Sequence, residues 1–352
     1  MTTLSRTMVP EPLMSIRAAE KSYRLRMGFM ASLMGKRVPE IRAVEDVDLD
    51  IGKGEVVALA GESGSGKTTL GKVLSLLEPP TSGSIWFDGL QLETLSGREK
   101  RRMRRRIQMI FQDPYESLDP RFTIFQTLHE PLIVHGIKDG GVTHRDMTRD
   151  VLDRVELRPP EDFLDRYPHE LSGGQRQRVA VARAIILHPD FIVADEPVSM
   201  MDASVRAGVM NMMLRLKNQL SLTYLFITHD LAVARYMADR IAIMYLGELV
   251  EVGNTDTVIN QPAHPYTQIL LSAVPIPDPT YGRKRVAVPG EIPSPTDKPS
   301  GCRFHPRCPY TEDICRHRRP GIVPLVDGHL ARCHFALGVQ GGNKTKKDRS
   351  AG

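Results

Sequence analysis

The stretch Gly61-Glu62-Ser63-Gly64-Ser65-Gly66-Lys67-Thr68 decides the fold of this 352-residue chain. It fits the pattern G-x-x-x-x-G-K-[ST], follows the apolar run Val56–Ala60 and opens a helical pattern, which is the context of a phosphate-binding loop. Its glycines let successive backbone N–H groups point at phosphate oxygens. Lys67 is expected to reach the β- and γ-phosphates of a nucleotide, and Thr68 to hold Mg²⁺. A Gly-rich turn with a chance lysine is the alternative, which the context disfavours.

Strand and helix patterns alternate around this loop. Apolar runs of strand length recur at Phe191–Ala194 and Thr223–Ile227, with a helical pattern extending to about residue 219 between them. Strands that alternate with helices favour a parallel sheet. Residues 14–95 are β-rich, whereas residues 96–180 are polar, Arg-rich and helical in pattern.

Composition indicates a soluble protein, since 25% of the residues are charged and 41% are hydrophobic. No apolar run approaches the roughly 18–20 residues that span a bilayer. Residues 1–11 contain no apolar core, so they do not resemble a secretory signal. We therefore expect a cytoplasmic chain with at most peripheral membrane contact. A net charge of +5 permits an anionic ligand without requiring one.

A second motif, Ile192-Val193-Ala194-Asp195-Glu196, is an apolar strand that ends in two carboxylates. Asp195 is positioned to bind Mg²⁺ directly or through water, and Glu196 to polarise an attacking water. Two surface acids after a strand would be common in isolation. They are less expected 128 residues after the lysine of a phosphate-binding loop, so we interpret them as catalytic.

A third motif is Leu171-Ser172-Gly173-Gly174-Gln175-Arg176-Gln177-Arg178-Val179. Ser and two Gly residues at a helix start leave N–H groups free, and with the helix dipole these form a second phosphate site. The motif resembles the signature of ABC ATPases. Further positions match that family in order: Tyr23 as an adenine-stacking aromatic, Gln112 as the Q-loop glutamine, Asp202 as the D-loop aspartate and His229 as the switch histidine.

The resemblance implies which residues bind ATP and Mg²⁺. Glu196, His229 and Gln112 would be catalytic, and Mg²⁺ would be held through Thr68, Gln112 and Asp195. The ATP contacts within the chain would be Tyr23, Gly61, Ser63, Gly64, Ser65, Gly66, Lys67, Thr68, Thr69 and Asp195. In a head-to-tail dimer, the partner's nucleotide would be contacted by Ser172, Gly173, Gly174, Gln175 and Asp202.

The same resemblance implies an α/β fold, namely a P-loop (RecA-like) ABC ATPase core with antiparallel β and α-helical subdomains and a small C-terminal Cys-rich extension. The nucleotide-binding domain is expected at residues 13–260, with its helical subdomain at about 96–180. The extension would cover residues 261–336, and residues 337–352 would form a disordered tail. One departure from the family pattern is Ser199-Met200-Met201-Asp202 instead of Ser-Ala-Leu-Asp, which predicts altered packing at the dimer interface without loss of activity.

Three further features resemble the ATPase subunits of oligopeptide and dipeptide importers. They are the extended stretch from Gln112 to Pro120, the sequence His264-Pro265-Tyr266-Thr267 before an apolar helix, and a Pro-rich connector followed by four cysteines. A spacer at residues 28–39 also suits this branch. Its substrates include peptides, nickel and some sugars, so peptide uptake is the main expectation and the others remain alternatives.

This branch implies an assembly at the cytoplasmic face of the inner membrane. The partners would be a second ABC ATPase subunit (a homologous chain or a second copy), two transmembrane permease subunits and an extracellular substrate-binding protein. A non-transport ABC ATPase is the less favoured alternative, because such proteins usually carry two cassettes or a long coiled-coil insertion.

Four cysteines, Cys302, Cys308, Cys315 and Cys333, follow the spacing C-x5-C-x6-C-x17-C. In a reducing compartment such a cluster indicates a metal rather than disulfides. The thiolates suit a [4Fe–4S] cluster or Zn²⁺, and a site without metal also stays open. The C-x2-C pairs common in zinc sites are missing. The importer subunits that this chain resembles carry an iron–sulfur cluster at such a segment, so the resemblance favours [4Fe–4S].

The basic run Arg98–Arg106 has seven Lys or Arg residues in nine positions. It lacks interleaved aromatic residues that would stack on bases, and no nucleic-acid-binding motif lies nearby. We therefore interpret the run as a solvated helix face and expect no nucleic-acid partner.

Overall fold

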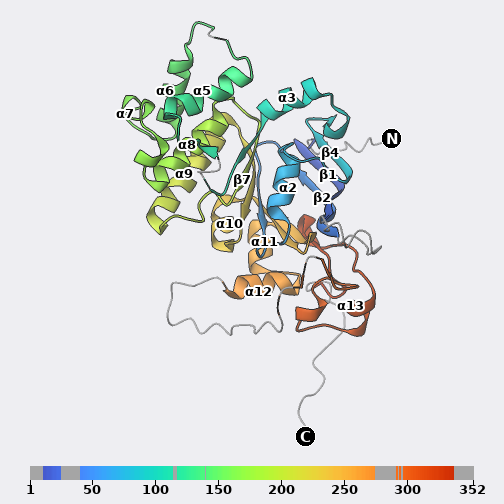
Figure 1. The fold of residues 1–352 in the computed structure, drawn as a ribbon. Helices are drawn as coiled ribbons and strands as arrows, with labels where there is room; N and C mark the ends of the chain where they lie inside the picture. The colour runs from blue at the N-terminus through green and yellow to red at the C-terminus, as the bar shows by residue number, and fades with distance from the viewer. Residues whose placement is uncertain are drawn as a thin grey trace, which may run out of the picture. The chain divides into compact units, whose positions relative to one another are not determined.

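The computed structural model describes residues 11–24, 40–113, 117–138, 140–273, 291, 293–294 and 296–336 (Figure 1). The chain forms two compact units. The first unit comprises Met1–Glu20, Asp46–Val56 and Leu70–Ile227, and the second comprises Lys21–Glu45, Val57–Thr69 and Thr228–Gly352. The expected spacer at 28–39, Pro114–Glu116, most of the Pro-rich connector and the tail at 337–352 lie outside the described residues.

A parallel sheet runs through the first unit. Its strands β6 (Ile107–Ile110), β7 (Phe191–Asp195) and β8 (Thr223–Thr228) pair in that order and all run parallel. Every residue of β7 and β8 is buried, which explains their continuous apolar sequences. The predicted strands at 191 and 223 are confirmed, each one residue longer than expected.

An antiparallel sheet accompanies it, with the order β2-β1-β4-β5. These strands are β1 (Met14–Arg24), β2 (Glu40–Ile51), β4 (Ser82–Phe87) and β5 (Leu90–Gln91). Met14 pairs with Phe87 and Ile16 with Ile85, and all four side chains are buried. This alternation of buried and open positions is the period-2 pattern of a sheet with one covered face.

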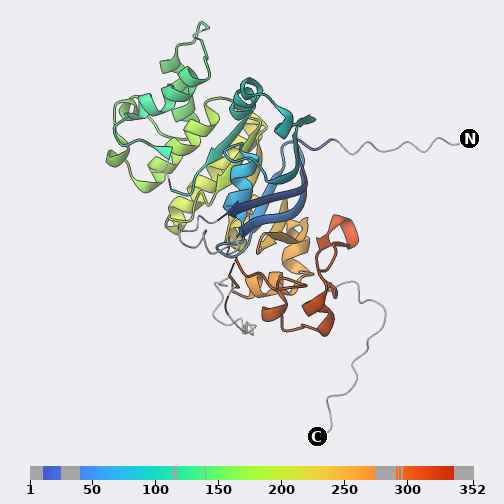
Figure 2. The same ribbon diagram turned by 45° about the vertical axis from the view of Figure 1, so that its right-hand side comes forward.

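Helices supply the remainder of the first unit. They are α3 (Gly97–Arg106), α5 (Ile124–Val134), α6 (His144–Arg154), α7 (Glu161–Leu164), α8 (Gly173–Ile185) and α9 (Ala203–Leu220). Figures 1 and 2 both show α5, α6, α7 and α8 gathered into one helical group. Capping boxes begin α3, α5, α6 and α8, because a Ser or Thr side chain accepts the N–H three residues on.

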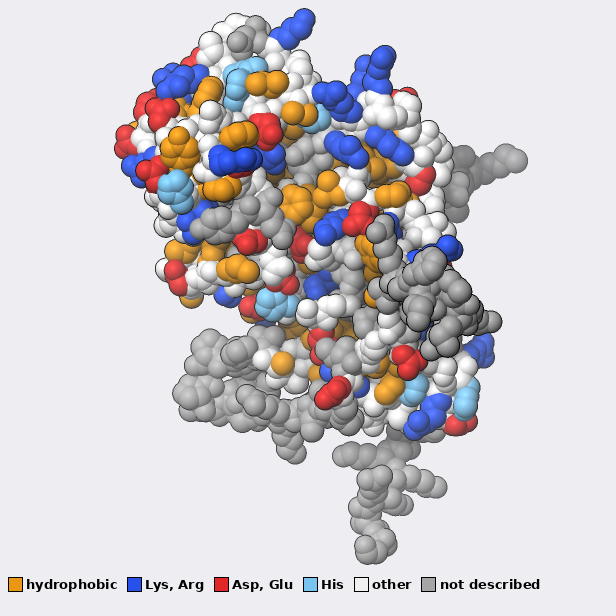
Figure 3. All heavy atoms as spheres, in the orientation of Figure 1, with side chains coloured by type: hydrophobic (Ala, Val, Ile, Leu, Met, Phe, Trp, Pro, Cys, Tyr) orange, Lys and Arg blue, Asp and Glu red, His pale blue; other side chains and the backbone are white. Residues whose placement is uncertain are grey.

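The basic run forms α3, as predicted. The helix has no buried residue, and Figure 3 shows Lys and Arg side chains gathered over this part of the surface. Arg104 donates to the backbone oxygen of Leu76, and Arg106 forms ion pairs with Asp88 and Asp190. Within the described part of the chain, no helix combines the length and apolar character needed to cross a bilayer.

The second unit has a mixed sheet. Val57–Ala60 of β3 (Val56–Ala60) runs parallel to β9 (Arg240–Tyr245), and β10 (Glu248–Asn254) runs antiparallel to β9. The last strands, β11 (Val323–Pro324) and β12 (Leu330–Ala331), extend it by antiparallel pairing of β12 with β10. The C-terminal segment is therefore part of the same sheet as the strand that precedes the phosphate-binding loop.

Helices α10 (Leu231–Met237), α11 (Thr255–Asn260), α12 (Pro265–Ala273) and α13 (Asp313–His317) complete the second unit. Tyr266 and Ile269 of α12 and Phe304 share one apolar cluster with Ala58 of β3 and Ile243 of β9. The aromatic rings of Tyr245, Tyr266 and Phe304 lie 4.6–5.4 Å apart between centroids. Burial of these rings holds the C-terminal extension against the base of the loop.

Candidate active site

The phosphate-binding loop connects β3 to helix α2 (Lys67–Leu74). The Nζ atom of Lys67 donates to the carbonyl oxygens of Gly61 at 2.8 Å and Glu62 at 2.9 Å, and the side chain is buried. The loop thus curls around its own lysine. This is the geometry expected from a short Gly-rich connection between a strand and a helix N-terminus.

Two of the loop glycines have no room for a side chain. A Cβ on Gly61 would lie 2.2 Å from the backbone oxygen of Met244, and one on Gly66 would lie 2.1 Å from that of Ala43. Gly66 also has φ = +106°, which L-residues rarely adopt. These contacts explain why the motif demands glycine at its two ends.

The other predicted nucleotide residues of the second unit are mostly accessible. Ser63, Gly64 and Thr68 are exposed, whereas Ser65 is buried. Tyr23 is half-buried in β1, with the Nζ atom of Lys21 5.1 Å from its ring centroid. His229 is exposed directly after β8.

The predicted carboxylates lie at the end of β7 in the first unit. Asp195 is its buried last residue, and Glu196 follows with φ = +44°. The Nε2 atom of Gln112 donates to Oε2 of Glu196 at 3.0 Å, so the structure brings these two predicted catalytic residues together. The backbone N–H of Glu196 donates to the oxygen of Ile227 at 3.0 Å, which fixes the turn.

The signature residues begin helix α8. Ser172 is its exposed N-cap: the Ser172 hydroxyl accepts the N–H of Gln175 at 3.3 Å, and the Gln175 side-chain oxygen accepts the N–H of Ser172 at 2.9 Å. Asp202 is the exposed N-cap of α9 and accepts the N–H groups of Val205 and Ser204. These hydrogen bonds lower the pKa of Asp202. Both segments present helix N-termini, which attract anions.

Sequence reasoning missed the surroundings of Glu62. Its carboxylate forms a two-point ion pair with Arg307, from Nη1 to Oε2 at 2.7 Å and from Nη2 to Oε1 at 3.0 Å. Its backbone N–H donates to the hydroxyl of Tyr266 at 2.8 Å. The sequence signal for this contact is the position of Glu62, an acidic residue inside a loop that binds anions. Such a residue is expected to pair with a basic side chain.

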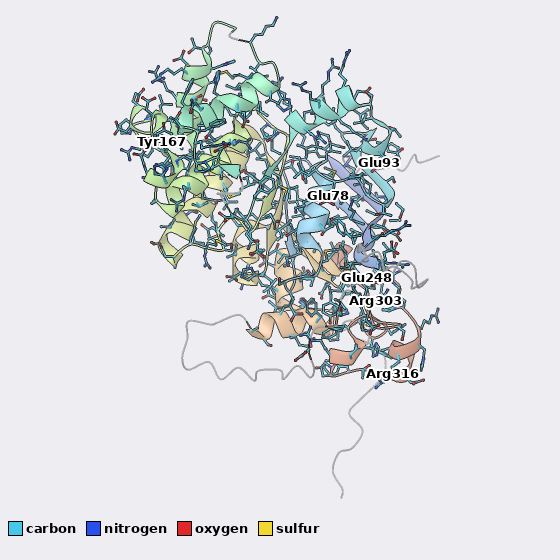
Figure 4. The ribbon with its side chains drawn as sticks, viewed as in Figure 1. Glu78, Glu93, Tyr167, Glu248, Arg303 and Arg316 are labelled. Atoms are coloured by element: carbon cyan, nitrogen blue, oxygen red, sulfur yellow. The ribbon has the colours of Figure 1, made fainter. Side chains whose placement is uncertain are left out.

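Buried charges also fasten the extension. The Glu45 carboxylate accepts from Lys298 at 3.1 Å and from Arg303 at 3.0 Å, and Arg303 reaches Glu248 at 3.3 Å. Glu248 and Arg303 lie next to one another in Figure 4. Burial opposes ionisation of Glu45, but the hydrogen bond and charge of Lys298, aided by Arg303, outweigh it and lower its pKa.

The four cysteines line one cavity of about 210 Å³ together with His264, Phe304, His305 and His334. All four lie in the described region and are free thiols. Burial raises the pKa of Cys302 to about 12 and that of Cys308 to about 11. The predicted metal is not confirmed, because the described residues contain no group of three or more His, Cys, Asp or Glu side chains arranged to hold a metal ion.

A phosphate-binding loop in a chain that also carries a Ser-Gly-Gly-Gln helix start defines the class of ATP-binding cassettes. Residues 44–199 match the family described as ABC transporter. Residues 250–315 match the family described as the C-terminal region of oligopeptide/dipeptide transporters. The chain therefore belongs to the ATP-hydrolysing ABC transporter family, in its oligopeptide/dipeptide branch, as its motifs predicted.

Curated relatives extend this likeness over most of the chain. A Brucella ovis protein that bears the provisional name of peptide import ATP-binding protein is 47% identical over 327 residues, which covers 93% of this chain and 98% of the relative. The dipeptide transport ATP-binding protein DppF of Haemophilus influenzae is 41% identical over 322 residues, covering 92% and 96%.

Solved structures confirm the predicted fold class. A dimeric ATP-binding cassette in a post-hydrolysis state, bound to ADP and Pi, superposes with a TM-score of 0.59 at 31% identity. The match covers 69% of this chain and 98% of that cassette. The protein cbiO1 from Clostridium perfringens, part of the ABC transporter complex cbiONQ, superposes with a TM-score of 0.60 at 23% identity. The match covers 71% of this chain and 92% of that protein, and it bears on the fold alone.

Proposed function

We propose that this chain couples ATP hydrolysis to the uptake of peptides as the ATPase subunit of an ABC importer. One observation carries the proposal: the match to the C-terminal region of oligopeptide/dipeptide transporters follows the match to the ABC transporter family in the same chain. The names of the relatives, peptide import and dipeptide transport, support the same substrate class.

ATP would bind with its phosphates on residues 61–69 and its adenine against Tyr23. Lys67 would exchange the carbonyl oxygens of Gly61 and Glu62 for phosphate oxygens. Its ammonium group has three N–H donors and a compact positive charge, which suit anionic oxygens. Thr68, Gln112 and Asp195 would bind Mg²⁺, whose hard oxygen preference matches these side chains.

Hydrolysis would use Glu196 to polarise the attacking water, with Gln112 and His229 as further catalytic residues. The hydrogen bond between Gln112 and Glu196 supports this pairing. Ser172, Gly173, Gly174, Gln175 and Asp202 would act in trans on the partner's nucleotide. Support comes from their exposed helix N-termini and from the dimeric cassette that resembles this chain.

We assign the nucleotide-binding domain to residues 13–260, with its helical subdomain at about 96–180, and the extension to residues 261–336. The partners would be a second ABC ATPase subunit, two transmembrane permeases and an extracellular binding protein, at the cytoplasmic face of the membrane. Nickel or sugar uptake within the same branch is the alternative substrate assignment.

The four cysteines would bind a [4Fe–4S] cluster with a structural role. A [4Fe–4S] cluster takes four Cys thiolates as its ligands, and the four cysteines line one cavity. Zn²⁺ bound by the same thiolates is the alternative. Backbone N–H groups two residues after Cys302, Cys308 and Cys333 hydrogen-bond to the sulfurs. Anaerobic purification tests this assignment: brown protein with bound iron would support it, and colourless iron-free protein would exclude it.

A tagged pull-down from detergent-solubilised membranes, read by mass spectrometry, tests the transport proposal. Two multi-span membrane proteins and a binding protein for peptides are expected to co-purify. A nickel- or sugar-binding protein instead would correct the substrate, and ribosomal or DNA-bound partners without any membrane protein would overturn transport altogether.

A further inference from the structure

Glu62 is held at three of its groups at once. Its carboxylate is paired with both terminal nitrogens of Arg307, its N–H donates to Tyr266, and its carbonyl oxygen accepts from Lys67. Two of these three contacts come from the C-terminal extension, from residues more than 200 positions away in the sequence. The conformation of the loop at Glu62 therefore depends on the extension.

Arg307 is itself held rigidly. Its guanidinium is buried, lies within hydrogen-bonding distance of the Tyr245 hydroxyl at 3.4 Å and packs near the rings of Tyr245 and Phe304. A planar guanidinium that forms two parallel bonds to a carboxylate fixes both distance and orientation. The pair of Arg307 and Glu62 is thus suited to position the loop as well as to neutralise the Glu62 carboxylate.

The backbone around Arg307 belongs to the cysteine segment. Arg307 ends the short 3-10 helix η3 (His305–Arg307), directly before Cys308. The carbonyl oxygen of Cys302 lies 3.1 Å from the N–H of His305 and 2.9 Å from its Nδ1. The position of the guanidinium is therefore set by the turn between the first two cysteines.

We propose that Arg307 is a positioning residue for ATP binding, through which the cysteine segment holds the phosphate-binding loop in its binding conformation. Arg307 acts on the nucleotide only through Glu62. Without it, the Glu62 carboxylate would remain close to the polyphosphate as an uncompensated negative charge, and the loop would lose the contact that orients its first turn. The inference rests on nucleotide binding at residues 61–69 and is independent of the transported substrate.

The test uses the full chain and a fluorescent ATP analogue. Arg307→Gln is expected to weaken nucleotide affinity by about 10- to 100-fold, because the uncompensated Glu62 carboxylate would repel the phosphates. KM for ATP should rise more than kcat falls, because Glu196 and Gln112 are untouched. Arg307→Lys keeps the charge but loses the two-point geometry, so its affinity should lie between those of the wild type and Arg307→Gln.

Two controls separate positioning from simple loss of fold. Arg316→Gln changes an exposed arginine of the same extension and should bind ATP like the wild type. Glu62→Gln removes the uncompensated charge, so adding Arg307→Gln to it should cost much less than Arg307→Gln alone. Wild-type affinity in Arg307→Gln, or equal losses with and without Glu62→Gln, would overturn the proposal. A wild-type chain that binds no ATP would instead contradict the nucleotide site itself.

Discussion

The strands of the cassette and the C-terminal extension are stabilised by different forces. β7 and β8 are buried at every position, and their side chains are mainly apolar. The extension buries Tyr266, Ile269 and Phe304 in an apolar cluster, and it adds charged contacts at Glu45, Glu62 and Glu251. Apolar burial is non-directional, whereas a buried charge depends on specific partners.

This difference suggests a division of roles. The cassette contains the chemical groups, and the extension controls the position of one of its loops. Substitutions in the cassette should therefore change catalysis with the fold intact, whereas substitutions of the buried charges should release the extension with the cassette still folded.

The largest effect is expected at Glu196 in the cassette. Glu196→Gln should lower ATP turnover by about 10²- to 10⁴-fold, the usual contribution of a general base. ATP binding should persist, because the phosphate-binding loop is unchanged. Phosphate release and analogue binding, measured side by side, check both halves of the prediction. Glu161→Gln, on an exposed glutamate, serves as the matched control. Turnover within a few-fold of the wild type would remove Glu196 from the catalytic role.

The next effect is expected at Glu251, which fastens the extension. Its fully buried carboxylate accepts from the N–H groups of Ala263 and His264 and contacts His329 at 2.7 Å. Glu251→Ala should destabilise the extension by about 3–5 kcal/mol, since it leaves buried donors without their acceptor.

Amide hydrogen exchange tests this prediction because it measures the protection of each region separately. Protection should fall in α12 and β12 while β7 and β8 keep theirs. Glu312→Ala, at an exposed glutamate of the extension, should leave protection unchanged. Equal loss of protection in the cassette strands would mean that the two regions unfold together.

A pH dependence is expected from His264. Burial lowers its pKa to about 4, partly opposed by the charge of Glu251. The unfolded chain, with a histidine pKa of about 6.5, binds more protons than the folded chain below that pH, so stability falls as pH drops from about 6.5 to about 4. The loss should reach about 3 kcal/mol at the lower end.

Urea unfolding of the extension at a series of pH values measures this slope. His264→Asn removes the titration while keeping an acceptor for the Tyr266 N–H, which His264 Nδ1 accepts at 3.1 Å. The variant should show a flatter profile over the same window. An unchanged slope would assign the acid sensitivity to other groups.

The same contrast explains what the sequence could predict. Local patterns identify β3, β7 and the loop between β3 and α2, because apolar runs and glycine spacing determine these elements by themselves. The pairs of Arg307 with Glu62 and of Glu45 with Lys298 join residues about 250 positions apart. No local pattern specifies such a contact, since any buried carboxylate could in principle select any arginine or lysine of the extension.

The smallest effect is expected at the two methionines before Asp202. Met200 is 73% exposed and Met201 is half-buried, with Arg206 donating to the Met201 carbonyl oxygen at 3.3 Å. Replacing Met200 by Ala and Met201 by Leu restores the usual family residues without touching Asp202. Turnover should stay within about 2-fold, because surface substitutions away from special contacts change free energies by about 0.5 kcal/mol or less. A much larger change in the steady-state rate, with ATP binding by the isolated chain preserved, would show that these methionines contact the second ATPase subunit and take part in hydrolysis there.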